Sequence, residues 1–410
     1  MTEPPALLLA GFEVWPGPSP WSRRVTEAVR AARGRHRVIT LSLREDDLPY
    51  SGSHEGARVL RVPLAAGALL DRLEAFARAV QRQLDGDVHA LVHTADPVVG
   101  AAVLAHPGRT SLLYEAGRLS PVELPWFPRA GGTDAAVEAT VRQCERSCLR
   151  RARAVVVATR SRAQEVRALG RRLAVHHVPL GIEPARAPRS RDRWASGPMR
   201  IRHLGWQLTP SGVLALARVA RRLGPGFRLE LVQPTGIHWG RDIRREVATA
   251  QTAGHLHPPG DGGVDVELLG AFGTEAGCPA TVAEALPALA EGRPVVAVDS
   301  DVARAELPAG CTFFCPPGDG AALAAALRAL RADAALRAGA GAQALAYVER
   351  EHHPAQVRGL LRDLYRHLGT SHSLEGLGLL RPGTPSPSEA SGAEWAWEPT
   401  DPGTPSGSFG

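Results

Sequence analysis

The strongest constraint on the fold is an alternation of short apolar runs with longer amphipathic stretches along the first half of the chain. Such alternation is typical of βαβ units, in which parallel strands form a sheet and amphipathic helices cover its faces. The expected strands are residues 7–11, 37–43, 59–62, 90–93, 111–115, 154–158 and 176–179. The expected helices are residues 23–32, 69–84 and 137–149, and a further helix that ends at Leu169. The pattern therefore predicts an α/β domain built on a parallel sheet.

The same alternation restarts after residues 186–199, a segment dense in Pro, Arg and Ser that we interpret as an interdomain linker. Strands are expected at residues 200–204, 227–232, 264–269, 294–298 and 312–314, and helices at residues 213–223, 281–290 and 320–331, followed by a last helical region at residues 335–368. Residues 233–263 are polar and rich in Gly, Pro and His, and they fit neither pattern. Because 410 residues exceed what one hydrophobic core usually supports, the length also indicates two domains.

These boundaries divide the chain into four folded or linking parts and a tail. They are a first Rossmann-like domain at residues 1–185, the linker, a second domain at residues 200–345, and a C-terminal helix at residues 346–368 that can cross back to the first domain. Residues 369–410 are rich in Pro, Ser, Gly, Thr and Glu, and cannot bury enough apolar surface to fold. We therefore expect a two-domain α/β protein with a disordered C-terminal tail.

Charge and hydropathy restrict the class of partner. All 48 basic residues are arginines, and they give the chain a formal charge of +6. The arginines are interleaved with glutamates, as on an ordinary solvated surface, so we expect no nucleic-acid partner. A basic surface still favours anionic groups and allows peripheral contact with a membrane. The chain has no apolar run of about 18 residues and no basic n-region ahead of an apolar stretch, so we expect a cytoplasmic protein.

The five cysteines predict reduced thiols, because their number is odd and the chain lacks a secretory signal. Cys144 and Cys148 are one helical turn apart, and Cys311 and Cys315 repeat that spacing, so a four-thiolate zinc site is an alternative. Zinc ribbons use tighter pairs, and we expect structural thiols and no bound metal. The histidine clusters at residues 176–177, 255–257 and 352–353 have no carboxylate or cysteine at ligand spacing.

Residues 274–296 carry the most specific pattern in the chain. They have the order strand, glycine-containing turn, helix start, loop and strand. Backbone N–H groups at such a helix start, together with the helix dipole, favour a bound phosphate. Glu284 lies early in this helix, where a carboxylate can accept hydrogen bonds from ribose hydroxyls. The segment by itself fits an ordinary capped helix equally well.

Several stretches of the chain follow the order found in one known family. Glu284-Ala285, Gly277, Pro279 and residues 292–296 match the donor-binding signature of that family. The other matching stretches are Tyr114-Glu115-Ala116 with residues 120–125, residues 145–161, 178–182 and 205–213, Glu306, and residues 316–319. Over roughly residues 6–368, the chain resembles the GT-B glycosyltransferases of family four.

The resemblance implies two Rossmann-like domains that face each other across a cleft. It also implies a retaining transfer of a hexosyl-type sugar from a nucleoside-diphosphate donor to a glycan or lipid-linked acceptor, as in cell-surface polysaccharide assembly. No metal or cofactor is expected, because the nucleotide sugar is a co-substrate. Helix N-termini and cations stabilise the departing diphosphate in this family.

The resemblance assigns the candidate site residues to three groups. The catalytic candidates are His93 and Glu275. The donor-binding candidates are Gly205, Ser211, Gly212, Gly277, Pro279, Ala280, Thr281 and Glu284. The acceptor-side candidates are Gly17, Ser19 and Glu115, of which the first two lie in the Pro- and Gly-rich loop after the first strand. For His93 and Glu115 a structural role at a strand end is an equal alternative.

The donor side departs from the family pattern at three positions. Trp206 and Ser211 stand where the family has an arginine and a lysine that hold the diphosphate. Ala276 stands where the first signature glutamate is expected, and Glu275 is one residue out of register. Arg202 and Arg293 are candidates to replace the missing cations.

These departures keep two other functions open. One is a catalytically silent GT-B protein that binds a nucleotide sugar, a glycan or a partner glycosyltransferase. The other is a nucleotide-sugar epimerase, which shares the two-domain fold but needs carboxylates in the cleft that the sequence does not place.

Overall fold

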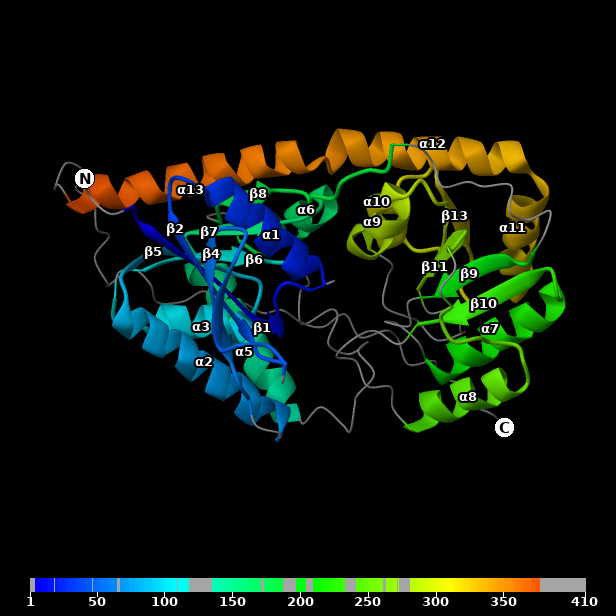
Figure 1. Cartoon of the computed structure of the whole chain (residues 1–410), viewed down its shortest axis with the longest axis horizontal. Helices are drawn as coiled ribbons and strands as arrows, with labels where there is room; N and C mark the ends of the chain where they lie inside the picture. Colours follow the sequence, from blue (N-terminus) through cyan, green and yellow to red (C-terminus); the bar gives the residue numbers. More distant parts are fainter. Residues whose placement is uncertain are drawn as a thin grey trace, which may run out of the picture. The chain divides into compact units, whose positions relative to one another are not determined.

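The computed structural model describes residues 4–17, 19–45, 47–64, 67–108, 110–117, 135–170, 173–186, 197–203, 209–232, 241–260, 263–270, 272 and 281–376. These residues form two β-sheets with helices on both faces of each sheet (Figure 1). Both sheets belong to one compact unit, Met1–Gly369. The predicted α/β class is confirmed.

The first sheet has eight described strands in the order β3-β4-β2-β1-β5-β6-β7-β8. Their bounds are β1 Ala6–Val14, β2 Arg37–Leu43, β3 Ser51–His54, β4 Ala57–Val62, β5 His89–Thr94, β6 Ser111–Glu115, β7 Ala154–Val157 and β8 Val175–His177. All neighbouring pairs are parallel except β3 with β4. The carboxyl ends of the parallel strands therefore meet at one edge of the sheet.

Strand β1 is buried on both faces, which explains its continuous apolar sequence. Because successive side chains of a strand point to opposite faces, Leu7 and Leu9 enter one core and Leu8 and Ala10 enter the other. Helices α1 Pro20–Ala32 and α13 Pro354–Gly376 pack in the first core. Helices α2 Leu69–Gly86, α3 Pro97–Ala105, α5 Ala135–Arg151 and α6 Arg160–Ala168 pack in the second, and Figure 1 shows α2, α3 and α5 on the face opposite α1 and α13.

The second sheet is fully parallel in the order β10-β9-β11-β12-β13. Its strands are β9 Met199–His203, β10 Phe227–Leu231, β11 Val266–Leu269, β12 Val295–Val298 and β13 Thr312–Cys315. Its helices are α7 Pro210–Leu223, α8 Arg241–Thr252, α9 Val282–Ala290, α10 Asp301–Glu306, α11 Gly320–Ala332 and α12 Ala334–Glu351.

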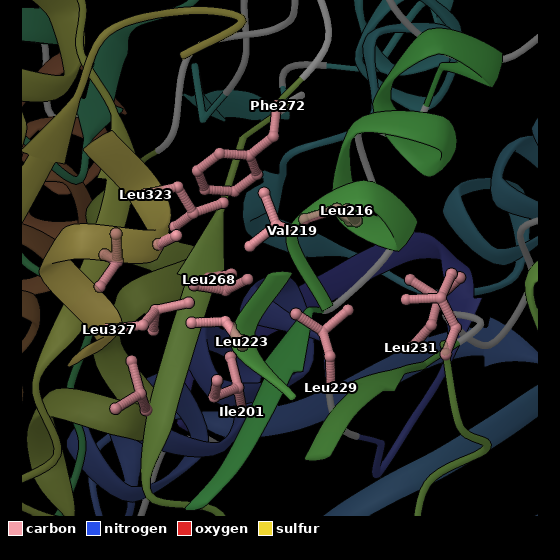
Figure 2. Packing of buried hydrophobic residues seen from close by; sticks show 14 of the residues in the cluster. Ile201, Leu216, Val219, Leu223, Leu229, Leu231, Leu268, Phe272, Leu323 and Leu327 are labelled. Carbon is pink, nitrogen blue, oxygen red and sulfur yellow. The ribbon is translucent and has the colours of Figure 1, made fainter. Parts of the chain in front are cut away.

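The helices of the second sheet divide between its two faces. Helices α7, α8 and α11 share one core, in which Figure 2 shows Ile201, Leu216, Leu268 and Leu323 gathered together. Helices α9, α10 and α12 share the other core, which also includes Leu180 from the segment that leaves the first sheet. The C-terminal chain therefore changes sheets, because α12 packs on the second sheet and α13 packs on the first.

The structure corrects four details of the sequence prediction. The helical region predicted at residues 335–368 breaks at residues 352–353 rather than at residue 346, because Pro354 disfavours a helical conformation at the residue before it. Helix α8 lies inside the polar stretch that fitted no pattern, and only Ile243, Val247 and Ala250 give it an apolar stripe. Helices α3 and α10 and strand β3 were not predicted. Helix α3 is apolar all round and shows no helical period, and α10 and β3 are short. Helix α13 continues to Gly376, past the predicted start of the tail. No helix among the described residues is long and apolar enough to cross a membrane.

Candidate functional site

The turn between β1 and α1 contains the predicted acceptor-side residues Gly17 and Ser19. The Gly17 backbone N–H donates to Ser22 Oγ at 2.7 Å, and Ser19 Oγ accepts from the Ser22 backbone N–H at 3.0 Å. The Ser19 hydroxyl also donates to the carboxylate of Glu13. A Cβ atom at Gly17 would lie 2.9 Å from the Val14 carbonyl oxygen, so only glycine fits here. Both residues thus build the tight turn that starts α1 at the carboxyl edge of the first sheet.

A cluster of four buried side chains lies directly behind this turn, and we call it the Arg24 cluster: Arg24, His93, Glu115 and Tyr365. Arg24 Nε donates to both Glu115 oxygens, at 3.0 and 2.8 Å. His93 Nε2 lies 3.3 Å from Glu115 Oε2, and His93 Nδ1 lies 2.9 Å from the Tyr365 hydroxyl oxygen. With its proton on Nε2, the imidazole accepts the Tyr365 hydroxyl hydrogen at Nδ1, and its Nε2 faces the Glu115 carboxylate without a well-formed hydrogen bond.

The Arg24 cluster joins α1, β5, β6 and α13 and also anchors the end of the first sheet. The Arg24 guanidinium donates to the carbonyl oxygens of Val178 and Pro179, where the chain leaves the sheet. Burial raises the pKa of Glu115, but Arg24 and His93 outweigh burial and hold that pKa below its usual value. Burial lowers the pKa of His93. The Glu115 carboxylate is therefore ionised and the imidazole is neutral.

The structure thus gives His93 and Glu115 contacts that differ from those expected of residues meeting a substrate. His93 is 0% and Glu115 is 4% exposed, and their polar atoms face one another, Arg24 and Tyr365. These contacts favour the structural alternative for both residues. Arg24 and Tyr365 were not among the predicted site residues. The sequence offers one signal for Arg24, because it is an arginine within the apolar face of α1. A buried arginine needs a counter-charge.

At the carboxyl edge of the second sheet, the start of α7 carries Ser211 and Gly212. Thr209 caps this helix, because its Oγ1 accepts from the Gly212 backbone N–H at 3.1 Å. The Ser211 hydroxyl lies 3.1 Å from the Thr209 hydroxyl and is half-buried. Ser211 therefore adds a neutral hydroxyl, and no charge, to the start of α7.

The start of α9 carries Thr281 and Glu284. The Thr281 backbone N–H donates to Glu284 Oε2 at 3.1 Å, so the carboxylate caps its own helix. Glu284 is 8% exposed and acts electrostatically on His203, the last residue of β9. His203 Nε2 donates to the Gly270 carbonyl oxygen at 2.8 Å. Burial lowers the pKa of His203 to about 4, against the raising effects of Gly270 and Glu284, so this imidazole is neutral near pH 7.

Helix α9 also receives a side chain from α1. Arg23 Nη2 donates to the Ala283 carbonyl oxygen at 3.2 Å. This carbonyl would normally accept from the N–H four residues later, but Pro287 occupies that position and has no N–H. Arg23 therefore satisfies a backbone acceptor that the proline leaves without its helical partner.

The two arginines proposed to replace the missing cations are held elsewhere. Arg202 donates to both oxygens of Glu267, and Arg293 Nη1 donates to Glu267 Oε2 at 2.8 Å. Glu267 is 1% exposed, and Arg293 precedes β12 at the amino edge of the sheet. Both arginines neutralise this buried carboxylate.

Two further residues singled out by the sequence lie at helix ends. Glu306 accepts from Thr159 Oγ1 at 3.0 Å, and burial raises the pKa of Glu306. Asp319 caps α11 by accepting from the backbone N–H groups of Ala321 and Ala322 at 2.9 and 2.8 Å. The remaining candidates lie outside the described residues: Gly205, Trp206, Glu275, Ala276, Gly277, Pro279 and Ala280.

Four of the five cysteines lie among the described residues, and Cys278 lies outside them. Cys148, Cys311 and Cys315 are buried, and burial raises the pKa of Cys311 to about 12, so its thiol stays protonated. Within the described part of the chain, no three His, Cys, Asp or Glu side chains gather as a metal site. His255 and His257 line a cavity of about 320 Å³. This cavity lies at the amino edge of the second sheet, opposite the starts of α7 and α9.

Comparison with known proteins gives a family match for the first domain and several structural matches for the whole fold. Residues 17–181 match the family described as glycosyl transferase 4-like domain. Sucrose-phosphate synthase from Thermosynechococcus elongatus aligns with a TM-score of 0.70 and 19% identity, over 90% of this chain and 100% of that chain. HepE of Anabaena, solved in complex with UDP-glucose, aligns with a TM-score of 0.65 and 14% identity, over 88% and 99%.

A third structure extends this picture. WaaG, a glycosyltransferase involved in lipopolysaccharide biosynthesis, aligns with a TM-score of 0.62 and 16% identity, over 87% of this chain and 99% of that chain. No curated protein sequence matches the chain significantly. The predicted resemblance to the GT-B fold is confirmed by these matches.

Proposed function

We propose that this chain, a GT-B protein whose first domain matches the glycosyl transferase 4-like family, transfers a sugar from a nucleoside diphosphate to an acceptor hydroxyl. The observation that carries the proposal is the start of α9, where Thr281, Glu284 and neutral His203 lie at the carboxyl edge of the second sheet. In open α/β sheets, ligands bind at this edge, and a helix N-terminus there favours a phosphate.

The proposed donor site divides between backbone and side chain. The N–H groups at the start of α9 face the diphosphate. Glu284 Oε2 accepts from the Thr281 backbone N–H, and the carboxylate also accepts hydrogen bonds from the ribose hydroxyls. The HepE structure contains UDP-glucose, which supports a nucleoside diphosphate sugar as the donor class. Glu275, Gly277, Pro279 and Ala280 precede this helix and are proposed to line the sugar end of the site.

The proposed reaction needs stabilisation of the leaving group rather than a cofactor. The bond between the anomeric carbon and the diphosphate oxygen breaks, and its electron pair stays on the diphosphate. The acceptor hydroxyl oxygen forms the new bond on the same face of that carbon, and its proton passes to the departing diphosphate. Retention of configuration follows from attack on that face. Positive groups around the diphosphate lower the barrier, because charge develops there in the transition state.

The acceptor side is proposed to use the turn between β1 and α1. Gly17 and Ser19 lie at the carboxyl edge of the first sheet, where an acceptor would reach the sugar. We propose a glycan or lipid-linked acceptor and a cytoplasmic reaction, with peripheral membrane contact where the acceptor is lipid-linked. The basic composition of the chain supports contact with anionic headgroups.

One observation supports a second candidate function, a catalytically silent GT-B protein that binds a nucleotide sugar. Ser211 contributes only a neutral hydroxyl to the start of α7, and Arg202 and Arg293 are held by Glu267. A titration with UDP, GDP and ADP, followed by assays of hydrolysis of the matching nucleotide sugars, separates the two functions. Binding with turnover supports the enzyme, and tight binding without turnover supports the silent protein. Failure of all three to bind would overturn both.

Glu284→Ala tests the position of the donor. Loss of the carboxylate should weaken binding of the preferred nucleoside diphosphate by roughly 1–3 kcal/mol, because the ribose loses its acceptor. Loss of the cap should also cost about 1 kcal/mol of unfolding free energy. Calorimetric titration and urea unfolding measure the two effects. Glu291→Ala, at the other end of α9, is the matched control and should leave binding unchanged. Equal affinity of Glu284→Ala and the wild type would show that the carboxylate does not hold the ribose.

A further inference from the structure

A cavity at the second sheet lies away from the proposed donor position. It has a volume of about 320 Å³, near the lower end of the range of roughly 300–1,000 Å³ that is common for small-molecule sites. Most of its walls come from the end of α7, the start of β10 and the segment that follows α8. These elements meet at the amino edge of the sheet, whereas Ser211 and Glu284 lie at the carboxyl edge. A ligand in this cavity would therefore occupy a separate site.

Among the residues that the structure describes, the charged and titratable side chains that line the cavity are all basic. They are Arg221 from α7, Arg228 from β10, and His255 and His257 from the segment after α8. Glu230, on the same strand as Arg228, is 1% exposed and is not part of the lining. It accepts from Arg228 Nε at 3.0 Å and from Arg200 Nε at 2.8 Å, so two arginines share one carboxylate. The cavity therefore keeps an excess of positive charge.

The side chains of Arg221 and His255 are available to a ligand. Within the described part of the chain, neither one has a hydrogen bond, an ion pair or a ring contact. Basic side chains at helix ends often serve the last carbonyl groups of the helix. Here backbone N–H groups do so, because Gly224 donates to the Ala220 carbonyl oxygen at 3.3 Å and His255 donates to the Ala250 carbonyl oxygen at 3.0 Å. Neither side chain is needed to cap α7 or α8.

The cavity also has an apolar wall, to which Ala220 and Phe227 contribute. The guanidinium of Arg331 lies over the Phe227 ring, with its carbon 5.0 Å from the ring centroid. A Cβ atom at Gly226 would collide with this guanidinium, so glycine is required beside Phe227 for the stacking to form. The aromatic ring is therefore held in a fixed position at the cavity. A site for a bare anion needs no such wall.

We propose that this cavity binds a phosphate monoester of a small ring-shaped molecule, with its phosphate on Arg221, Arg228 and His255 and its ring against Phe227. A phosphate monoester near neutral pH carries about two negative charges and about three strongly accepting oxygens, which suits donors that come from three elements. An aromatic side chain packs well against a ring. The binding is reversible and changes no covalent bond. The inference goes beyond the proposed function and does not depend on it.

Calorimetric titration of the full chain with phenyl phosphate, inorganic phosphate and phenol tests the two halves of the site. The wild type should bind phenyl phosphate more tightly than either of the other two. Arg221→Gln should weaken binding of phenyl phosphate roughly 10-fold, because the phosphate loses a charge-assisted hydrogen bond. Arg218→Gln is the matched control, since it removes an exposed arginine of α7 that does not line the cavity, and it should bind as the wild type does.

Phe227→Leu tests the apolar wall. Leucine keeps an apolar contact with the core but lacks the ring, so phenyl phosphate should bind several-fold more weakly while binding of inorganic phosphate stays unchanged. Thermal unfolding establishes that each variant is folded, and Arg221→Gln should keep the Tm of the wild type because it breaks no described contact. Equal affinity of Arg221→Gln and the wild type for phenyl phosphate, or no binding by the wild type, overturns the site. Equal affinity of the wild type for phenyl phosphate and inorganic phosphate overturns the role of Phe227.

Discussion

The carboxyl edges of the two sheets differ in how their buried polar side chains are used. At the first sheet, the Arg24 cluster is buried, and its members bind one another and the carbonyls of Val178 and Pro179. At the second sheet, Thr209 and Glu284 bind backbone N–H groups at the starts of α7 and α9. The first edge therefore has a buried ion pair that fixes helices to the sheet in addition to helix caps such as Ser19, whereas the described polar groups Thr209 and Glu284 order helix starts at the second edge.

This difference bears on where a ligand can bind. A buried ion pair adds specificity to the packing of α1 and α13, and its members face one another in this structure. A capped helix start keeps further N–H groups and a partial positive charge at its end. The Arg24 cluster therefore makes the first edge rigid, the starts of α7 and α9 keep backbone N–H groups at the second edge, and Arg23 makes a contact between the two.

The largest expected effect comes from breaking the Arg24 cluster. Glu115→Ala should lower the free energy of unfolding by about 3–5 kcal/mol, because Arg24 becomes a buried charge without a counter-ion. Urea unfolding measures the loss. Glu55→Gln is the matched control, because Glu55 pairs with Arg30, which lies on the exposed side of the helix that carries Arg24. This substitution should lower the free energy of unfolding by at most about 1 kcal/mol. Similar losses in the two variants would remove the contrast between buried and exposed pairs.

An intermediate effect is expected from pH at the second edge. Burial lowers the pKa of His203 from its usual value of 6.5 to about 4. Between these values the unfolded chain binds a proton at His203 that the folded chain does not, so stability should fall as the pH falls from 6.5 to 4. The contribution of this one group is of order 3 kcal/mol at pH 4.

The comparison with His203→Gln isolates that contribution, because other buried histidines titrate in the same direction. Glutamine keeps an N–H for the Gly270 carbonyl but does not titrate. Urea unfolding at pH 7, 6 and 5 should show a shallower loss of stability in the variant. A parallel pH dependence in the two proteins would mean that His203 is accessible to protons in the folded state.

The smallest expected effect is at the periphery of the Arg24 cluster. Tyr365→Phe keeps the ring packed in the first core but removes the hydroxyl that lies 2.9 Å from His93 Nδ1, at a cost of about 1 kcal/mol. Tyr347→Phe removes a comparable hydroxyl from His352 at a part-buried position and should cost less. Urea unfolding of both variants compares the free energy of unfolding that each loses with its hydroxyl. A larger loss in Tyr347→Phe would contradict the expectation that the more deeply buried hydrogen bond contributes more.

Some of these features follow from local sequence signals, and others do not. Strand positions, the tight turn at Gly17 and the capped helix at Thr281 follow from local signals, namely apolar runs, glycine, and a threonine three residues before a glutamate. The separate fates of Arg23 and Arg24 do not follow from such signals. Adjacent residues of a helix point about 100° apart, and which direction meets a carboxylate or a carbonyl depends on elements far away in the chain.

The same limit applies to His93 and Tyr365, which are 272 residues apart in the sequence. A strand-end histidine fits a substrate contact or a structural bond equally well until the partner is known. That partner is Tyr365, whose hydroxyl lies beside the imidazole only because α13 packs on the first sheet. Likewise, Pro287 by itself predicts an irregular helix, and only the packing of α1 supplies the donor for the carbonyl that it exposes.

The sequence by itself therefore determined the α/β class, the two alternating segments and the starts of α2, α9, α11 and α12, because these depend on residues close together in the chain. The tertiary structure alone decided which charges are buried, that His93 and Glu115 join Arg24, and that Arg23 reaches α9. Such pairings depend on long-range packing, since the energy of a charge is set by the groups that surround it and not by its neighbours in sequence.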